Sequence, residues 1–396
     1  MRVLIFGAGA VGLGFMGDLL SRASADLVFA DVNSPLVASL ARRGQYTISK
    51  ADLEKISPLT VRGVRAVDTG QPGGRAQLAE ELAVADFCLT SVGARALPLV
   101  GKSLAAALRQ GPERTPLNCL CCENHRDAAG LLREAVAGVL GAEEAAARCG
   151  FVNAVVGRMC QSLTPHPLSL RERGKTNLTR ADRDLPPLTP DLDTVLLVED
   201  YDPFPLDAGA WRGPVAAPPC LEPVPTAQFV AYEHRKLYGH NGVHALLGVL
   251  GKARGYKFFS EAGQDAELDA LARRALWEEV GAALVRAHPR YFTEASMDVF
   301  ASNLYARLVN PVFADEIERG AKDTLRMIRP EDGRLAGAAL FVAAQRIEPR
   351  ALCAGVAAAL RDNGLRIEAL AEVLAEAEAG PAEQVMVLVA GELGKR

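Results

Sequence analysis

The chain is poor in aromatic residues and lacks a strong excess of charge of either sign. Only 6% of its 396 residues are Phe, Trp or Tyr, which argues against stacking platforms for single-stranded nucleic acid. The 44 basic and 48 acidic residues leave a formal net charge of -4, so no basic excess indicates a nucleic-acid partner. No uninterrupted apolar run reaches the roughly 18 residues of a transmembrane helix. The composition therefore predicts neither a nucleic-acid nor a membrane partner.

Cysteine is also scarce, with eight residues in the whole chain, which is too few for a disulfide scaffold. Cys119, Cys121 and Cys122 cluster in NCLCCEN, but no second pair follows at zinc-ligand spacing. We therefore expect reduced thiols at the end of a buried strand, no metal site and a cytoplasmic location. The apolar N-terminus is broken by glycines, which favours a strand and turn over a signal peptide.

The first part of the chain alternates strand-like and helix-like segments. Short apolar runs stand at residues 2–6, 27–30, 87–92 and 117–121. Strands separated by helical segments predict a parallel sheet with helices on both faces. The first half of the chain is therefore predicted to be an α/β domain.

The rest of the chain changes in composition twice. Twelve of the 23 prolines lie in residues 161–225, which predicts irregular or edge-strand structure because proline removes backbone donors. Segments rich in Ala, Leu, Glu and Arg follow, and they predict helices over residues 227–253, 266–287, 334–344, 350–363 and 367–378. We expect one domain over residues 1–222, including a proline-rich extension over 161–222, and a mostly α-helical domain over 223–396.

A glycine-rich loop follows the first apolar run. Gly7, Gly9 and Gly12 form the pattern G-x-G-x-x-G between a strand and a helical segment. The first glycine permits a tight turn, the second lets the backbone approach a pyrophosphate, and the third allows close packing of helix on strand. The free N–H groups of the helix then favour the phosphates. This arrangement predicts a Rossmann-type dinucleotide-binding domain.

An acidic residue ends the second apolar run. Asp31 lies 19 residues beyond Gly12, a spacing typical of dinucleotide-binding folds. Its carboxylate would accept hydrogen bonds from the adenosine ribose and repel a 2′-phosphate, and no arginine directly follows it. The predicted cofactor is therefore NAD.

Two later strand ends carry further candidate cofactor-binding residues. Gly93 follows the run at 87–92, and Glu123 and Asn124 follow the run at 117–121. In open parallel sheets, ligands bind beyond the carboxyl ends of the strands. We expect Gly93 to let the cofactor approach, and Glu123 and Asn124 to reach the nicotinamide ribose or the substrate.

The first helix expected after the proline-rich segment gathers polar residues on one side. At 100° per residue, an arc of about 140° holds Glu233, Lys236, His240, Asn241 and His244. Beside a nonpolar nicotinamide ring, desolvation would lower the pKa of Lys236, which is then predicted to act as general base. Asn241 would donate to a developing oxyanion, and His244 would orient substrate hydroxyls. The alternative is a solvated face with Lys236 paired to Glu233.

Several stretches resemble a known family. Lys236, Asn241 and His244 form K-x4-N-x2-H, the signature of the polyol-specific long-chain dehydrogenase/reductase (mannitol dehydrogenase) family. Six stretches in chain order look like its mannitol-1-phosphate 5-dehydrogenase branch: FGAGAVGLGFMG, FADVN, TSVGA, PLNCLCCEN, GFVNAVVGR and EHRKLYGHNGVH.

The resemblance implies NAD-dependent, metal-independent interconversion of mannitol 1-phosphate and fructose 6-phosphate. It assigns Lys236 as general base, and Asn241 with Asn153 as groups that polarise the reacting oxygen. It also implies that Arg319, Lys322 and Arg326 bind the substrate, where they would hold a phosphate by charge-assisted hydrogen bonds.

Other functions stay open at this point. One alternative is the same chemistry on an unphosphorylated polyol or a sugar acid, and another is a non-catalytic NAD(H)-binding protein. A ketopantoate-reductase-like enzyme also combines a glycine loop, a helical domain and a lysine, but it lacks the K-x4-N-x2-H spacing. The sequence does not distinguish a monomer from a homodimer.

Overall fold

The computed structural model describes residues 1–110, 115–163 and 185–395. It divides into two compact units, Met1–Phe229 and Val230–Arg396. The domain boundary expected from the sequence, after residue 222, lies in the last part of the first unit. Residues 164–184 of the proline-rich segment lie outside the described residues.

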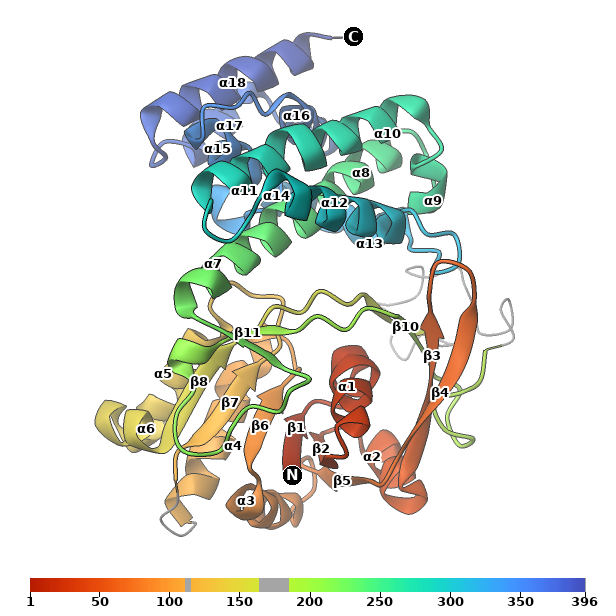
Figure 1. Cartoon of the computed structure of the whole chain (residues 1–396), viewed down its shortest axis with the longest axis vertical. Coiled ribbons are helices and arrows are strands. Elements are labelled where there is room, and N and C mark those ends of the chain that lie inside the picture. Colours follow the sequence, from red (N-terminus) through yellow and green to blue (C-terminus); the bar gives the residue numbers. More distant parts are fainter. Residues whose placement is uncertain (111–114, 164–184, 396) are drawn as a thin grey trace. The chain divides into compact units, whose positions relative to one another are not determined.

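The first unit is built on a six-stranded parallel sheet (Figure 1). Its strands are β1 (Arg2–Phe6), β2 (Asp26–Asp31), β5 (Val64–Asp68), β6 (Phe87–Thr90), β7 (Leu117–Cys121) and β8 (Cys149–Asn153). They lie in the order β5-β2-β1-β6-β7-β8, and every neighbouring pair is parallel. The chain runs outward from β1 in both directions, so the topological switch point, where such sheets bind ligands, lies between β1 and β6.

Helices connect these strands. The first is helical over residues 10–22 and contains a π-helical segment, Gly12–Gly17, followed by α1 (Asp18–Arg22). The others are α2 (Ser34–Arg43), α3 (Gly74–Val84), α4 (Leu97–Gln110), α5 (Ala128–Leu140) and α6 (Ala142–Arg148). The apolar strands predicted at residues 2–6 and 117–121 have these bounds in the structure.

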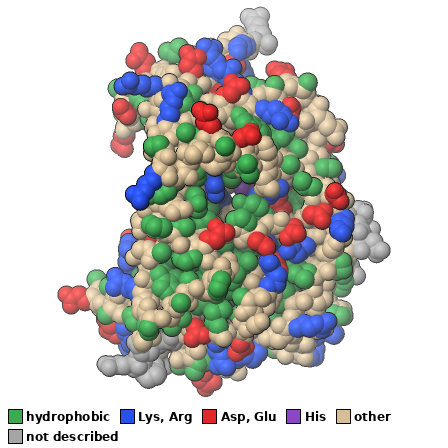
Figure 2. All heavy atoms as spheres, viewed as in Figure 1, with side chains coloured by type: hydrophobic (Ala, Val, Ile, Leu, Met, Phe, Trp, Pro, Cys, Tyr) green, Lys and Arg blue, Asp and Glu red, His purple; other side chains and the backbone are tan. Residues whose placement is uncertain are grey.

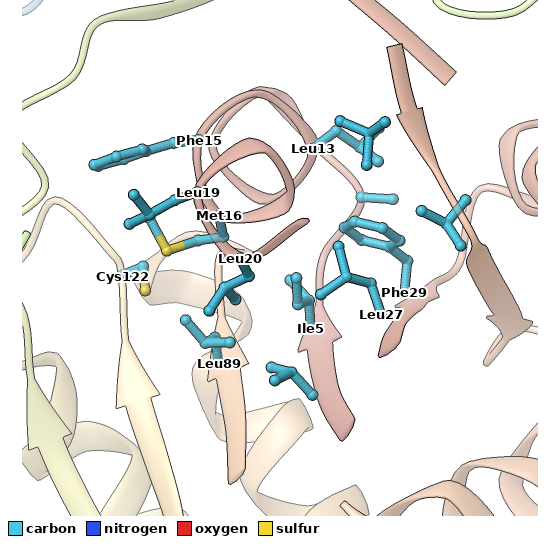
Figure 3. Close-up of a cluster of buried hydrophobic side chains, with 14 of the residues drawn as sticks. Ile5, Leu13, Phe15, Met16, Leu19, Leu20, Leu27, Phe29, Leu89 and Cys122 are labelled. Atoms are coloured by element: carbon cyan, nitrogen blue, oxygen red, sulfur yellow. The ribbon is translucent and has the colours of Figure 1, made fainter. Parts of the chain in front are cut away.

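Hydrophobic clusters cover both faces of the parallel sheet, because successive strand residues point to opposite sides. Val3 and Ile5 of β1 pack in the cluster that contains Phe15 and Met16 of the first helix (Figure 3). Leu4 and the other alternate residues pack in the cluster with α3, α4 and α5. Burial on both faces explains why β1 is apolar from Val3 to Phe6.

A second sheet takes in part of the proline-rich segment. It has the order β4-β3-β10-β9, with β3 (Gln45–Ala51), β4 (Ile56–Arg62), β9 (Cys160–Leu163) and β10 (Val195–Glu199). Strand β10 pairs with β3 on one side and with β9 on the other, so the prediction of only irregular or edge structure is wrong there. The reason is local, since residues 195–198 read VLLV, contain no proline and are buried. The short strands β11 (Pro205–Asp207) and β12 (Glu222–Val224) pair separately.

The second unit is helical throughout its regular structure (Figure 1). Helix α7 (Thr226–His234), whose residues up to Phe229 belong to the first unit, continues through a π-helical segment, Arg235–Asn241, into α8 (Gly242–Ala253). The other helices are α9 (Phe259–Ala262), α10 (Ala266–Arg273), α11 (Ala282–Ala287), α12 (Glu294–Leu308), α13 (Ile317–Gly320), α14 (Thr324–Met327), α15 (Ala336–Ala344), α16 (Arg350–Asp362), α17 (Ile367–Val373) and α18 (Ala379–Gly394). Residues 274–281, between α10 and α11, are also π-helical.

The predicted fold class is confirmed. A Rossmann-type parallel sheet precedes a mostly α-helical domain. Among the described residues, no helix is long and apolar enough to cross a bilayer. On the face shown in Figure 2, Lys and Arg side chains are interspersed with Asp and Glu.

Candidate functional site

The three glycines of the loop after β1 meet different steric demands. Gly7 has φ +98°, and a Cβ there would lie 2.6 Å from the carbonyl oxygen of Ser91. At Gly12, a Cβ would lie 2.1 Å from the carbonyl oxygen of Gly7, so the first helix packs directly on the loop. At Gly9, no atom lies within 4 Å of where a Cβ would be. The loop therefore needs the outer two glycines for its own packing, and it leaves the backbone at Gly9 open to a ligand.

Two polar side chains, one after β6 and one after β7, make hydrogen bonds at the carboxyl ends of the strands. The Ser91 hydroxyl donates to the carbonyl oxygen of Gly7 at 3.0 Å. The buried Glu123 carboxylate accepts from the Thr90 hydroxyl at 2.7 Å and from the backbone N–H of Val92 at 3.1 Å. Burial raises the pKa of Glu123, and these two hydrogen bonds oppose the rise. The described contacts of Glu123 are thus internal, and its contact with a cofactor stays a prediction.

Asp31 is tied to the glycine loop. Its Oδ2 accepts from the backbone N–H of Ala8 at 2.7 Å, and its Oδ1 accepts from the N–H of Asn33 at 2.8 Å. Val32, the next residue, is 73% exposed. The carboxylate therefore stands at the end of β2, next to the loop that is predicted to hold the pyrophosphate.

The remaining candidates of the first unit follow other strands of the same sheet. Gly93 has φ +81°, and the space within 4 Å of the position that a Cβ would take there is open. Asn124 is exposed just beyond β7. Asn153 ends β8, and its Oδ1 accepts from the N–H of Ala129 at the start of α5, at 2.9 Å. Because the strands are parallel, their carboxyl ends share one edge of the sheet.

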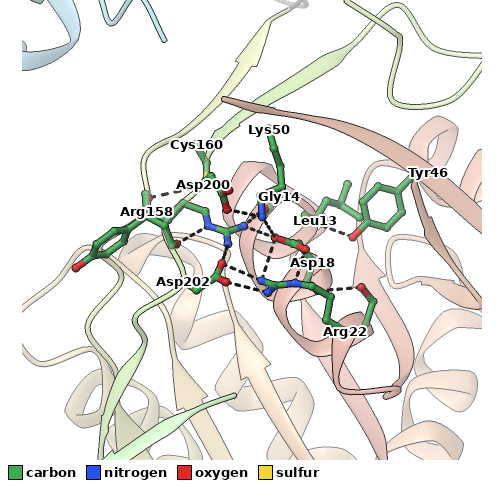
Figure 4. A network of polar contacts seen from close by, with 12 residues as sticks. Leu13, Gly14, Asp18, Arg22, Tyr46, Lys50, Arg158, Cys160, Asp200 and Asp202 are labelled. Atoms are coloured by element: carbon green, nitrogen blue, oxygen red, sulfur yellow. Dashed lines mark hydrogen bonds and ion pairs between the residues drawn. The ribbon is translucent and has the colours of Figure 1, made fainter. Parts of the chain in front are cut away.

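A buried ion-pair network lies beneath the first helix (Figure 4). The Arg158 guanidinium contacts Asp18 at 2.7 Å and donates to the carbonyl oxygen of Gly14 at 3.0 Å. It also lies over the ring of Phe15, 4.3 Å from the centroid. Asp18 receives a further ion pair from Lys50 of β3 at 3.3 Å. The network therefore fixes the helix that follows the glycine loop to the segment after β8 and to the second sheet.

In the second unit, the candidate catalytic residues lie on the continuous helix formed by α7, the π-helical segment and α8. A uniform wheel of 100° per residue does not apply here, because Arg235–Asn241 is π-helical. In a π-helix the backbone hydrogen bonds join residues five apart, so Lys236 and Asn241 fall in the same row. π-Helical winding is frequent at functional sites, and nothing in the 3.6-residue spacing of the sequence indicated it here.

Lys236 is partly buried and has an altered pKa. Desolvation lowers the pKa of its ammonium from 10.5 to about 8. The negative charge of Glu233 raises the pKa, and the positive charge of Arg334 lowers it further. A lysine with a pKa near neutrality exchanges a proton readily at physiological pH.

His244, on α8, is held by an acidic residue 71 positions away. Its Nε2 lies 2.9 Å from Oδ2 of Asp315, and its ring stacks on Phe259 at a centroid distance of 4.2 Å. The carboxylate of Asp315 also accepts from Arg319, with Nε at 2.6 Å and Nη2 at 2.5 Å. Asp315 was not among the predicted site residues, because nothing in its local sequence pairs it with α8.

The predicted substrate-binding cations have different surroundings. Arg319 of α13 pairs with Asp315, and Arg326 of α14 pairs with Asp332 at 2.9 Å. Lys322 is exposed between these two helices. Two further arginines, Arg307 and Arg334, add positive charge near His240 and Lys236, respectively. The candidate site in this unit therefore contains more cations than the predicted three.

The clustered cysteines lie at the end of a buried strand. All eight cysteines of the chain are free, and Cys119, Cys121 and Cys122 are buried at the carboxyl end of β7 and directly after it. Burial raises the pKa of Cys122 well above its usual value, which makes it an unreactive thiol. Within the described residues, no group of three or more His, Cys, Asp or Glu side chains is arranged to hold a metal ion.

Comparison with solved structures agrees with this fold. The mannitol 2-dehydrogenase of Pseudomonas fluorescens, solved as a ternary complex with NAD and D-mannitol, superposes with a TM-score of 0.67 at 15% identity, covering 100% of this chain and 91% of that one. A D-sorbitol dehydrogenase in substrate-free form gives a TM-score of 0.68 at 15% identity, covering 98% of this chain and 91% of that one. At this identity, the likeness concerns the fold.

Sequence comparison identifies the family. The chain is 30% identical over 369 residues to a mannitol-1-phosphate 5-dehydrogenase of Geobacillus thermodenitrificans, covering 91% of this chain and 86% of the relative. It is 32% identical over 367 residues to a mannitol-1-phosphate 5-dehydrogenase of Brevibacillus brevis, with the same coverage of 91% and 86%. The mannitol dehydrogenase Rossmann domain model matches residues 1–177, and the mannitol dehydrogenase C-terminal domain model matches residues 228–366. The chain therefore belongs to the mannitol dehydrogenase family.

Proposed function

We propose that this protein is an NAD-dependent oxidoreductase that interconverts mannitol 1-phosphate and fructose 6-phosphate. The observation that carries the proposal is Lys236, partly buried with a pKa of about 8 and in one π-helical row with Asn241. The open backbone at Gly9 and the carboxylate of Asp31 fit a dinucleotide that carries an unphosphorylated ribose.

The chemistry follows from these side chains. In the direction of oxidation, neutral Lys236 accepts the proton of the substrate hydroxyl at Nζ. A bound NAD would supply the hydride acceptor for the carbon that carries this hydroxyl, so that the alcohol is oxidised to a ketone. Asn241 and Asn153 donate hydrogen bonds to the reacting oxygen as it gains negative charge. In the direction of reduction, the protonated lysine returns the proton.

The phosphate of the substrate is assigned to the cations of the second unit. Arg319 lies in α13, Arg326 in α14 and Lys322 between them. The relatives at 30% and 32% identity are named mannitol-1-phosphate 5-dehydrogenases. Guanidinium groups bind phosphate in bidentate geometry, which supports Arg319 and Arg326 in this role. Arg319 also pairs with Asp315, which fixes the plane of its guanidinium.

The proposal is tested by NADH oxidation at neutral pH with fructose 6-phosphate and, separately, with fructose. We expect strong preference for the phosphorylated sugar. Activity with fructose alone would keep the chemistry and exclude the phosphate assignment. Turnover of neither sugar together with tight NADH binding would favour a non-catalytic NAD(H)-binding protein.

A variant separates catalysis from cofactor binding. Lys236→Ala removes the proton acceptor, so we expect turnover to fall by roughly 10²-fold or more while NADH binding stays nearly unchanged. Retention of most of the turnover would exclude Lys236 as the general base. Arg286→Ala is a suitable control, since its described hydrogen bond goes to the backbone of Gln345 in another part of the helical unit.

A further inference from the structure

One buried carboxylate joins two side chains of the candidate substrate site. The side chain of Asp315 is 1% exposed, whereas those of His244 and Arg319 are 15% and 40% exposed. Oδ2 of Asp315 lies 2.9 Å from Nε2 of His244, and both carboxylate oxygens accept from Arg319. The three side chains thus form a chain of hydrogen bonds from the interior toward solvent.

The protonation states along this chain follow from the charges. Although burial acts to raise it, the positive charge of Arg319 and the hydrogen bond from His244 hold the pKa of Asp315 well below its usual range. An ionised carboxylate only accepts hydrogen bonds, so Nε2 of His244 must carry the hydrogen. Burial lowers the pKa of His244, so its ring is neutral near pH 7 and Nδ1 has a free lone pair.

The surrounding residues hold the imidazole in place. Its ring stacks on Phe259 with an interplanar angle of 16°. The backbone N–H of Phe259 donates to the carbonyl oxygen of Asp315 at 3.0 Å, so the stacking partner and the carboxylate are joined directly. At Gly320, a Cβ would lie 3.0 Å from Cε1 of His244 and 2.4 Å from Cζ of Phe259. The imidazole ring therefore has little freedom to rotate, and a ring flip that would swap the positions of Nδ1 and Nε2 is hindered.

We propose that Asp315 is a positioning residue that holds His244 as the Nε2–H tautomer, so that Nδ1 accepts a hydrogen bond from a hydroxyl of the sugar substrate. The inference rests on the proposed function, in which His244 contacts the substrate. The same carboxylate fixes the guanidinium of Arg319. Asp315 therefore sets the spacing between a hydroxyl acceptor and a cation that is proposed to bind the phosphate.

The tautomer itself is measurable without substrate. The full chain is labelled with 15N-histidine, and long-range 1H–15N spectra are recorded at pH 7.5, with the His244 signals assigned by their loss in His244→Gln. We expect a pyrrole-type Nε2 and a pyridine-type Nδ1. A pyridine-type Nε2, or an imidazolium ring, would overturn the proposal whatever the activity of the enzyme.

A conservative variant tests the consequence. In Asp315→Asn, one amide oxygen replaces two acceptor oxygens, so Arg319, which donates to both of them, competes with His244 for it. Without the carboxylate charge the Nε2–H tautomer loses its selective stabilisation, so we expect the Nδ1–H tautomer to gain population and the ring to lose its acceptor toward the substrate. We expect the KM for fructose 6-phosphate to rise about tenfold, as for a lost hydrogen bond to a buried polar group, with an unchanged Kd for NADH.

The control is Asp269→Asn. Asp269 also pairs with an arginine, Arg273, and accepts from Tyr305, but it contacts neither His244 nor Arg319. We expect this variant to leave both the tautomer and the KM unchanged. An unaltered tautomer and KM in folded Asp315→Asn would overturn the proposal. If Asp315→Asn does not fold, the wild-type spectrum alone decides the tautomer.

The proposed function and the positioning role of Asp315 can be excluded separately. If the protein turns over no sugar phosphate but shows the Nε2–H tautomer, the proposed function is wrong and the positioning by Asp315 stands as a structural feature. If fructose 6-phosphate is reduced but the tautomer is Nδ1–H, the function stands and the role of Asp315 is excluded.

Discussion

The guanidinium of Arg158 lies 2.7 Å from the carboxylate of Asp18, and neither side chain is accessible to solvent. Asp18 belongs to the helix that follows the glycine loop, and Arg158 follows β8 by five residues, so the pair joins segments 140 residues apart. Without Arg158, the buried carboxylate of Asp18 would keep only its longer contacts to Lys50 at 3.3 Å and Arg22 at 3.0 Å, and the loss of hydrogen bonds to a charged group is costly.

Arg158→Met should therefore destabilise the first unit by about 2–3 kcal/mol. The free energy of unfolding is measured by urea denaturation in a Trp277→Phe background, in which Trp211 of the first unit is the remaining tryptophan. Arg22→Met is the matched control, because Arg22 contacts the same Asp18 from a position where its side chain is 43% exposed. We expect that variant to lose no more than about 1 kcal/mol. Equal losses in the two variants would contradict the importance of burial.

Gly9→Ala should weaken NADH binding without unfolding the protein. Gly9 does not have a positive φ and has no atom within 4 Å of its Cβ site, so alanine fits the unliganded loop. The added methyl group would occupy the space that the pyrophosphate needs, and we expect the Kd for NADH to rise at least about tenfold. Fluorescence titration of NADH measures it.

Gly138→Ala controls for the effect of alanine itself. Gly138 lies within α5 and also has open space around its Cβ site. Alanine in a helix should stabilise the protein by roughly 0.5–1 kcal/mol and leave NADH binding unchanged. If Gly9→Ala binds NADH as tightly as Gly138→Ala does, the cofactor does not approach the loop at Gly9.

Asp31→Asn should relax the preference for NADH over NADPH. The change removes a negative charge next to the predicted ribose site, and repulsion between unit charges about 4 Å apart is worth about 1 kcal/mol even in bulk water. We expect the ratio of kcat/KM for NADPH to that for NADH to rise at least about fivefold. Asp52→Asn is the control, because Asp52 also accepts from two backbone N–H groups, in the turn between β3 and β4. A ratio that changes equally in both variants would exclude a specific role for Asp31.

The pH dependence of turnover should follow Lys236. Oxidation of the polyol needs the neutral amine, so its kcat/KM should rise with pH and level off above about 8. Reduction of the ketose needs the ammonium, so its kcat/KM should fall as the pH rises through about 8.

Two variants should shift the pH dependence of kcat/KM in opposite directions. Glu233→Gln removes a charge that raises the pKa of Lys236, so the pH at which kcat/KM changes should become lower. Arg334→Met removes a charge that lowers the pKa of Lys236, so the pH at which kcat/KM changes should become higher. If the pH dependence of kcat/KM shifts in neither variant, the group that titrates is not Lys236.

The sequence by itself determined the local features of this protein. The apolar run of β1, the glycine spacing from Gly7 to Gly12 and the acid at the end of β2 were all predictable, because each depends on residues that are near neighbours along the chain. The K-x4-N-x2-H spacing likewise predicted the family, which the family comparison confirms, and it made Lys236 a candidate.

Only the tertiary structure decided which distant groups meet these local features. The winding of Arg235–Asn241 as a π-helix, the pairing of β10 between β3 and β9, and the contact between Asp315 and His244 have no local signal. They depend on how helices and strands pack after the chain has folded, and the last of them spans 71 residues. The candidate catalytic residues were therefore readable from spacing, whereas the groups that orient them were not.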